Sequence, residues 1–240
     1  LCLVAAGANT SVILKDANLM PMFAGIGTAL RVVSDRRSGE KLDSVVRTVN
    51  RGGAQCGVHL VPLKSGGVYV GAGNRVVRAP VSDVSTRFET VRYLLSTAER
   101  EFMGPQWAYQ AEGEVALGLR PRSLDGLPLF GPLHEAPEVF VATGTNRVGL
   151  TWAAEWAKQI SRYFSDGVNE ELIESWKPDR SPISYSTREQ ALHYFTNSRV
   201  SAALEHKVIE NDAKQKISKS LEVSKFAERV LDELEMSFGE

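Results

Sequence analysis

Two arginines near glycines in the second half of the chain are the residues best suited to bind an acidic ligand. Arg120 lies in a Gly-Leu-Arg-Pro stretch, and Arg147 lies in a turn bracketed by Gly144 and Gly149. A guanidinium holds a carboxylate through two parallel N–H donors and keeps its charge at every pH that a protein meets. No acid–base pair stands out beside them, so these residues favour binding and positioning over proton transfer.

The segment around Arg147 also predicts a helix start that can face a ligand. A buried strand is predicted over 138–143, and a helix is predicted from Leu150 to Phe164, directly after the glycine turn. The first amides of a helix have no acceptor inside it, and the helix dipole places partial positive charge there. Glycines let a flat or anionic ligand approach that backbone. Such a turn is also ordinary α/β construction, so a site and a plain connection both stay open.

Arg120 has a second interpretation that the sequence leaves open. Glu112 and Asp125 lie nearby, and either carboxylate could pair with its guanidinium. Asp125 precedes Gly126, so we expect its side chain to cap a turn. We interpret Arg122 as a solvated residue.

A long stretch resembles the C-terminal flavin-binding segment of the D-amino-acid-oxidase-like FAD-dependent oxidoreductases; it reads GLRPRSLDGLPLFGP and then VFVATGTNRVGLTWAAEWAKQI. That family includes glycine oxidases, sarcosine oxidases and D-amino-acid dehydrogenases. Its pattern joins a Gly-x-Arg-Pro stretch, an acidic-Gly-x-Pro stretch, a strand, a glycine-rich turn and a helix. The resemblance implies an enzyme that uses FAD to oxidise the C–N bond of an amino acid or a secondary amine by hydride transfer to the flavin.

The resemblance also implies roles for individual residues. It implies that Arg120 and Arg147 bind the carboxylate of a small-molecule substrate. The positions that match flavin contacts of the family are Gly144, Arg147, Val148, Gly149, Leu150 and Thr151. Helix-start amides would there stabilise negative charge on the reduced flavin. No catalytic acid or base is implied, because the cofactor carries the difficult step.

The beginning of the chain suggests that part of the cofactor site precedes it. Leu1 to Ala6 is predicted to be a buried strand, which needs parallel neighbours. The overlapping run of residues 3–11, LVAAGANTS, resembles the end of the family's dinucleotide-binding part. The G-x-G-x-x-G fingerprint for pyrophosphate occurs nowhere in the sequence. We therefore expect the chain to be the C-terminal portion of a longer enzyme and to be inactive alone.

The patterns together predict an α/β (α+β) fold with three parts. Part of an FAD/NAD(P)-binding, Rossmann-like domain is expected over 1–19 and 113–180, an antiparallel β-sheet substrate domain over 20–112, and a helical extension over 181–240. Within the substrate domain we expect strands over 28–34 and 44–50, a hairpin of 58–63 and 67–71, a helix over 86–102 and a strand over 107–117.

The helical extension has no counterpart in the resemblance. Ser186 and Glu189 have the spacing of a capping box, and Ile209, Ala213, Ile217 and Leu221 recur every four residues. The extension could dock on the body of the protein, bind a partner protein or a second copy, or be partly disordered. Its mixed charges argue against a membrane surface.

Composition excludes several other functions. The net charge is −1, which argues against nucleic-acid binding, and no apolar run is long enough to span a membrane. Cys2 and Cys56 form no motif, which favours a reducing, cytoplasmic location. His59 is interpreted as a sheet-surface or hydrogen-bonded residue and His134 as a histidine without companions, and no metal-ligand spacing occurs.

Two other hypotheses compete with a flavoenzyme. The chain could be a fragment or degenerate copy that lacks catalysis and acts as a binding or assembly module through its helical extension. It could also be an unrelated α/β domain whose glycine turns imitate the family. The missing G-x-G-x-x-G supports the first of these.

Overall fold

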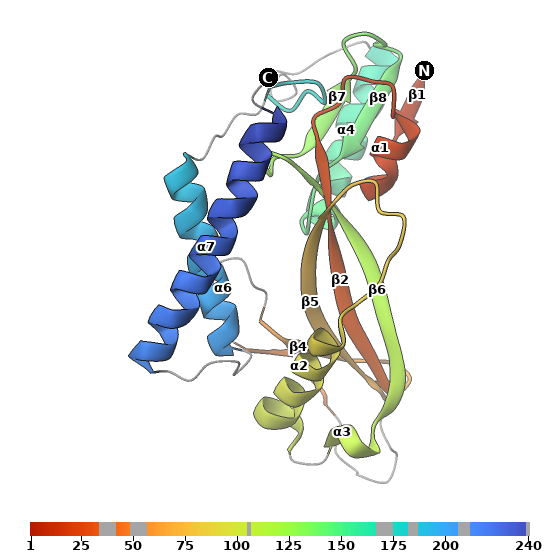
Figure 1. Cartoon of the computed structure of the whole chain (residues 1–240). Coiled ribbons are helices and arrows are strands. Elements are labelled where there is room, and N and C mark those ends of the chain that lie inside the picture. Colours follow the sequence, from red (N-terminus) through yellow and green to blue (C-terminus); the bar gives the residue numbers. More distant parts are fainter. Residues whose placement is uncertain are drawn as a thin grey trace. The chain divides into compact units, whose positions relative to one another are not determined.

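The computed structural model describes residues 1–33, 42–48, 57–104, 107–166, 175–181, 187–205 and 212–238 (Figure 1). These residues group into two compact units. Unit 1 comprises Leu1–Ala29, Gly73–Thr90 and Val115–Ser184, and unit 2 comprises Leu30–Ala72, Val91–Glu114 and Tyr185–Glu240. The domain boundaries expected from the sequence stay a prediction.

The strands are β1 (Cys2–Val4), β2 (Met22–Val33), β3 (Val46–Arg47), β4 (His59–Pro62), β5 (Val68–Arg78), β6 (Glu112–Ser123), β7 (Leu129–Pro132) and β8 (Val139–Thr143). The helices are α1 (Thr10–Ile13), α2 (Phe88–Ala98), α3 (Trp107–Gln110), α4 (Gly149–Asp166), α6 (Arg188–Glu205) and α7 (Ala213–Phe238). Short turns of other helix types occur at Gly7–Asn9 and Glu99–Met103.

A three-stranded sheet with the order β1-β8-β7 lies in unit 1. β1 runs parallel to β8, with Leu3 opposite Phe140, and β8 pairs antiparallel with β7. The first strand therefore has the parallel neighbour that the sequence predicts. The prediction that this strand is buried is wrong for Leu1 and Leu3, which are exposed because β1 is the edge of this sheet.

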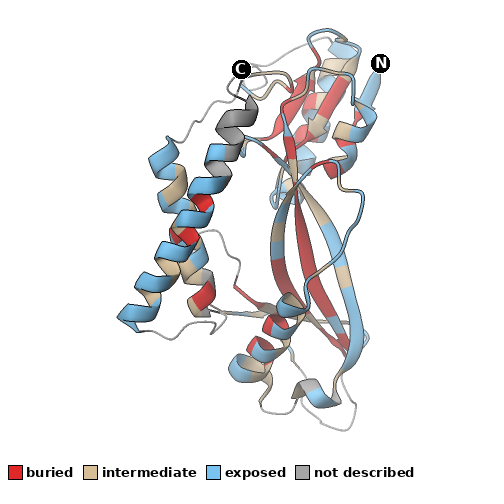
Figure 2. Ribbon diagram, in the orientation of Figure 1, coloured by how far each residue is buried: buried red, intermediate tan, exposed pale blue. Residues whose placement is uncertain are grey.

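Aromatic side chains fix α4 against this sheet. Phe130 of β7 and Phe140 of β8 are fully buried, and the Phe130 ring centroid lies 4.5 Å from that of Trp156 on α4. Buried aromatic rings contribute large apolar areas, so this cluster holds the start of α4 in place. The helix confirms the one predicted over 150–164, and Figure 2 shows buried residues concentrated in β7 and β8.

A five-stranded sheet has the order β3-β4-β5-β2-β6. β4 pairs antiparallel with both β3 and β5, with Leu60 opposite Val70, which confirms the predicted hairpin. In unit 2, α2 contributes Leu94 to the core beneath this hairpin. Buried residues follow β2 and β5 in Figure 2.

The segment before Arg120 differs from the prediction in two ways. Residues 107–110 form the short helix α3 instead of a strand, and β6 continues through the Gly118–Pro121 stretch, beyond the predicted strand end at residue 117. Pairing with β2 overrides the local turn signal of glycine and proline. Proline is tolerated because β6 is an edge strand.

Helices α6 and α7 of the extension pack against each other in unit 2. The Phe195 and Phe226 rings stack at a centroid distance of 6.4 Å, and Arg188 pairs with Asp232. The capping box at the start of α6 uses Thr187 and Gln190, which bond each other's backbone amides at 3.2 and 3.0 Å. Ser186, which was predicted to form the capping box with Glu189, lies outside the described residues. Cys56 also lies outside them.

The mixed sheet, the antiparallel sheet and the helical extension confirm the predicted α/β fold class. Within the described ranges, no helix is long and apolar enough to cross a membrane. The same ranges contain no cluster of His, Cys, Asp and Glu that could hold a metal ion.

Candidate functional site

The turn between β8 and α4 has a backbone that requires glycine at its first position. Gly144 has a φ of +76°, and a Cβ atom there would lie 3.1 Å from the backbone nitrogen of Leu129. Asn146 follows at a φ of 50°, a value that asparagine tolerates better than most residues. The local sequence thus explains why the chain turns sharply before Gly149.

Backbone contacts attach this turn to β6. The amide of Asn146 donates to the carbonyl of Pro121 at 2.7 Å, and Arg122 forms an antiparallel bridge with Thr145. Arg120 immediately precedes Pro121 in the chain. The two predicted halves of the site, the Gly-Leu-Arg-Pro stretch and the glycine turn, are therefore neighbours in space.

The start of α4 presents amides that have no acceptor within the helix. The amide of Trp152 donates to the carbonyl of Val148 at 3.1 Å, which is the first bond of the helical pattern. The amides of Gly149, Leu150 and Thr151 precede that bond, so they have no acceptor within the helix. The Leu150 side chain is 95% exposed and Val148 is 44% exposed. Polar donors and uncovered apolar side chains therefore occur together at this helix start.

This combination fits one end of a flavin. A flat aromatic ring with a polar edge would cover Val148 and Leu150, and its edge could accept from the amides of the first turn. Gly149 has little spare room, because a Cβ there would lie 2.9 Å from the Thr145 hydroxyl oxygen. The residues present thus suit the isoalloxazine end of FAD, whereas the chain contains no G-x-G-x-x-G for its pyrophosphate.

The Arg120 side chain lies across β2. Its Nη1 donates to the Oδ1 of Asn74 at 3.1 Å. A Cβ added to Gly27 would lie 2.6 Å from both Nη atoms of Arg120, so the guanidinium occupies the space that this glycine leaves. Arg120 is half-buried, and no carboxylate among the described residues pairs with it. The alternative pairing with Glu112 or Asp125 is therefore not observed.

Asp125 has another partner. It accepts from the Leu127 amide at 3.0 Å, which confirms that it caps the turn, and it also pairs with Arg180 at 2.8 Å. Burial raises the pKa of the Asp125 carboxyl, but hydrogen bonds from Leu127, Ser123 and Arg180 lower it, and the net pKa lies below the ordinary aspartate value. No local signal in the sequence indicates Arg180 as this partner, since 55 residues separate the pair.

Arg147 and Arg122 are exposed. Within the described part of the chain, Arg147 pairs with no carboxylate, so its charge is available at the turn. Arg122 has the exposure predicted for a solvated residue.

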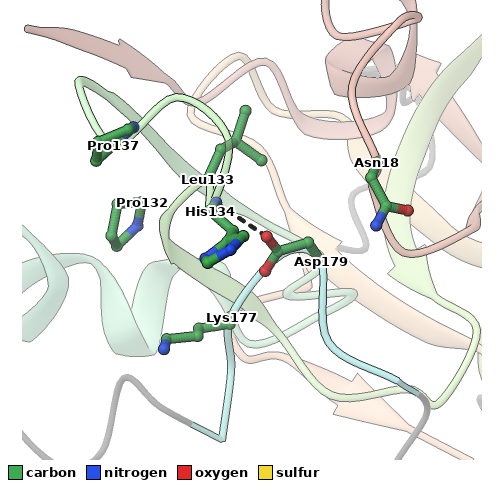
Figure 3. A pocket seen from close by; sticks show the side chains of 7 residues that line it. All are labelled: Asn18, Pro132, Leu133, His134, Pro137, Lys177 and Asp179. Carbon is green, nitrogen blue, oxygen red and sulfur yellow. Dashed lines mark hydrogen bonds between the residues drawn. The ribbon is translucent and has the colours of Figure 1, made fainter.

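A hollow of about 390 Å³ lies elsewhere in unit 1 (Figure 3). Its lining residues are Asn18, Pro132, Leu133, His134, Pro137, Lys177 and Asp179. The backbone amide of His134 donates to the Asp179 carboxylate at 2.9 Å, and His134 belongs to no metal-ligating cluster among the described residues. None of the predicted site residues lines this hollow, so it is separate from the arginine and helix-start site.

His59 lies on β4 of unit 2, and its ring centroid is 6.1 Å from that of Tyr69. A Cβ on Gly71 would lie 2.7 Å from its Nε2, so the ring packs over the neighbouring strand. This placement matches the interpretation of His59 as a sheet residue.

Comparison with known proteins identifies the family. The sequence profile described as DAO, FAD dependent oxidoreductase, matches residues 2–163, which is more than half of the chain. The chain belongs to this family. None of the curated proteins matches the DAO chain at a significant level.

Solved structures share the fold of this DAO chain. Glycine oxidase from Geobacillus kaustophilus has a TM-score of 0.58 at 21% identity, covering 75% of this chain and 45% of its own. Iminodiacetate oxidase from Chelativorans sp. BNC1 has a TM-score of 0.56 at 20% identity, covering 73% and 45%. L-proline dehydrogenase from P. horikoshii has a TM-score of 0.56 at 16% identity, covering 74% and 46%. The chain thus spans less than half the length of these relatives.

Proposed function

We propose that this DAO chain is part of an enzyme that oxidises the C–N bond of an amino acid or a secondary amine with FAD. The observation that carries the proposal is the position of the half-buried Arg120 guanidinium on the strand that contacts the turn before α4. The similar structures support it, because their names refer to glycine, iminodiacetate and L-proline, which are all amines with a carboxylate. A cytoplasmic location stays a prediction.

The cofactor would supply the acceptor for a hydride from the carbon that bears the nitrogen. The chain itself would hold the ring end of the cofactor. The residues proposed to contact it are Gly144, Arg147, Val148, Gly149, Leu150 and Thr151. The helix-start amides and the α4 dipole are directed donors, which stabilise negative charge without reorganising. Exposed Val148 and Leu150 would cover apolar ring surface and exclude water from it.

Arg120 is proposed to bind the substrate carboxylate. A guanidinium that is already held by Asn74 loses little side-chain freedom on binding, which favours a defined ligand orientation. Arg147 adds a second cation in the turn. No side chain of the site is assigned a proton-transfer step, because an amine that arrives neutral needs no base before its C–H bond breaks.

Replacing Arg120 with Met tests this function directly. We expect Arg120→Met to raise the apparent binding constant of the substrate by a decade or more, since it removes charge-assisted bonds of about 1.5–3 kcal/mol. Steady-state kinetics and the visible flavin spectrum of the full-length enzyme give the measurement, and the spectrum should not change. Arg122→Met, two residues further along β6 and exposed, is the matched control. An unchanged binding constant would rule out the role of Arg120.

A non-catalytic assembly role is the second candidate. It is favoured by Ile217 and Leu221 of α7, which are exposed apolar residues one helical turn apart. The sequence of the rest of the polypeptide distinguishes the enzyme from the assembly module. A G-x-G-x-x-G between a strand and a helix in the same polypeptide would support the enzyme, whereas its absence from the complete polypeptide would support an assembly module.

A further inference from the structure

Three neighbouring strands of the five-stranded sheet bring two polar side chains together above two glycines. The strand order places β5, β2 and β6 side by side. Asn74 of β5 and Arg120 of β6 are bonded to each other at 3.1 Å. A Cβ on Gly25 would lie 2.9 Å from the Asn74 oxygen and 3.5 Å from the Arg120 Cβ. Gly25 and Gly27 have no side chains, so Asn74 and Arg120 can lie close against the backbone of β2.

The side chain of Asn74 lies on the same face of the sheet as that of Arg120. The next residue back, Gly73, faces the opposite side, where a Cβ would collide with Thr90 and lie 3.2 Å from the Thr28 Cβ. Successive residues of a strand alternate between faces, so Asn74 belongs to the face of Arg120. Asn74 is also exposed, which leaves its side chain accessible to a ligand.

The chemistry of the two groups fixes the orientation of the Asn74 amide. A guanidinium has five N–H donors and no acceptor, so only the carboxamide oxygen can face it. The Asn74 nitrogen must therefore point away from Arg120, with its two N–H donors directed elsewhere. The pair as a whole presents donors: the unused N–H groups of Arg120 and those of the Asn74 nitrogen. A ligand that fills this place must bring acceptors to both.

We propose that Asn74 is a specificity-determining residue that selects substrates with a second acceptor group beside the carboxylate held by Arg120. This inference rests on the proposed carboxylate role of Arg120. The favoured class is an amine or amino acid that carries a further carboxylate or carbonyl oxygen close to the first. A substrate with only an apolar group there leaves the Asn74 donors unpaired once water is excluded, which costs binding free energy.

Binding of simple anions tests the inference without turnover. The probes are malonate, which has two carboxylates, and acetate, which has one, each titrated by calorimetry into the intact protein. We expect the unsubstituted protein to prefer malonate, and Asn74→Ala to reduce that preference by about tenfold, the size of one charge-assisted hydrogen bond. Acetate affinity should change by less than about threefold, because Arg120 keeps its charge.

Site-specific readouts separate this role from a merely structural one. The side-chain amide signals of Asn74 in a 15N-labelled sample should shift with malonate and much less with acetate. Asn74→Asp places a carboxylate against Arg120 and should weaken both anions, because the internal carboxylate competes for the guanidinium. Asn18→Ala, an exposed asparagine of the same unit, is the matched control.

The outcomes distinguish the inference from the function on which it rests. An unchanged malonate preference in Asn74→Ala, with acetate binding lost in Arg120→Met, overturns the role of Asn74 and keeps that of Arg120. Unchanged acetate binding in Arg120→Met overturns the carboxylate site itself.

Discussion

Two arginines of unit 1 show how the same side chain can serve the fold or a ligand. The side chain of Arg180 is 8% exposed, and it bonds both oxygens of Asp125 and the carbonyls of Pro128 and Lys177. Arg120 is half-buried and has the neutral Asn74 as its hydrogen-bond partner. The charge of Arg180 is matched inside the protein, whereas the charge of Arg120 is held in place without being neutralised.

The two arginines differ in the partners that a bound carboxylate would have to displace. A carboxylate that approached Arg180 would have to displace Asp125, whose side chain is itself fully buried. A carboxylate that approached Arg120 displaces only water and gains a positioned donor pair. A positioned but unneutralised guanidinium therefore favours a binding role, and a saturated one favours a structural role.

The largest predicted effect is the loss of the buried pair. Arg180→Met should lower the free energy of unfolding by about 3–5 kcal/mol, because it leaves the Asp125 charge buried without its partner. Arg120→Met should cost less than about 1 kcal/mol, since it removes one hydrogen bond to an exposed amide. Denaturant unfolding of both variants gives the measurement. Equal losses would contradict the division of roles.

Acid should weaken the pair of Asp125 and Arg180. The pKa of Asp125 lies below its ordinary value in the folded protein, so its stabilisation is present above the unfolded pKa and is lost as pH falls through the folded pKa. We expect Asp125→Asn to be less stable than the unsubstituted protein at neutral pH and to lose less stability on acidification. Unfolding followed from pH 7 downward checks this, and parallel curves for the two proteins would contradict it.

Next in size is the backbone effect at the turn before α4. Gly144→Ala should cost about 1–2 kcal/mol, because alanine disfavours a positive φ. It should also weaken flavin binding by displacing the helix start. Gly118→Ala is the matched control, since a Cβ there meets nothing within 4 Å. Thermal unfolding and the flavin spectrum of the full-length enzyme distinguish the two glycines, and equal behaviour would show that the turn has no special requirement.

The smallest effect is expected from the helical extension. α6 and α7 make many contacts with each other and carry none of the proposed flavin or substrate residues. Deleting residues 181–240 should therefore leave the visible flavin spectrum of the full-length enzyme unchanged. Size-exclusion chromatography of the same variant reports whether the extension joins copies. Loss of flavin would instead assign the extension to the core of the enzyme.

Local signals in the sequence determined the strand, turn and helix that form one half of the site. Three signals lie next to one another in the sequence: the apolar run of β8, the glycine at Gly144 and the amphipathic pattern of α4. No distant contact is needed to predict the elements that they form. The FAD-dependent family was identified from the same stretch and is confirmed by the match over 2–163.

Contacts between segments distant in the chain decided the remainder. The partnership of Arg120 with Asn74 spans 46 residues, and that of Arg180 with Asp125 spans 55. Sheet order and register bring Arg120 of β6 to Asn74 of β5, whereas the segment that carries Arg180 is attached by backbone bonds such as that from the Phe130 amide to the Trp176 carbonyl. Both arrangements depend on hydrogen bonds between segments distant in the chain. For the same reason Gly118–Pro121 became part of a strand, although its glycine and proline locally favour a bend.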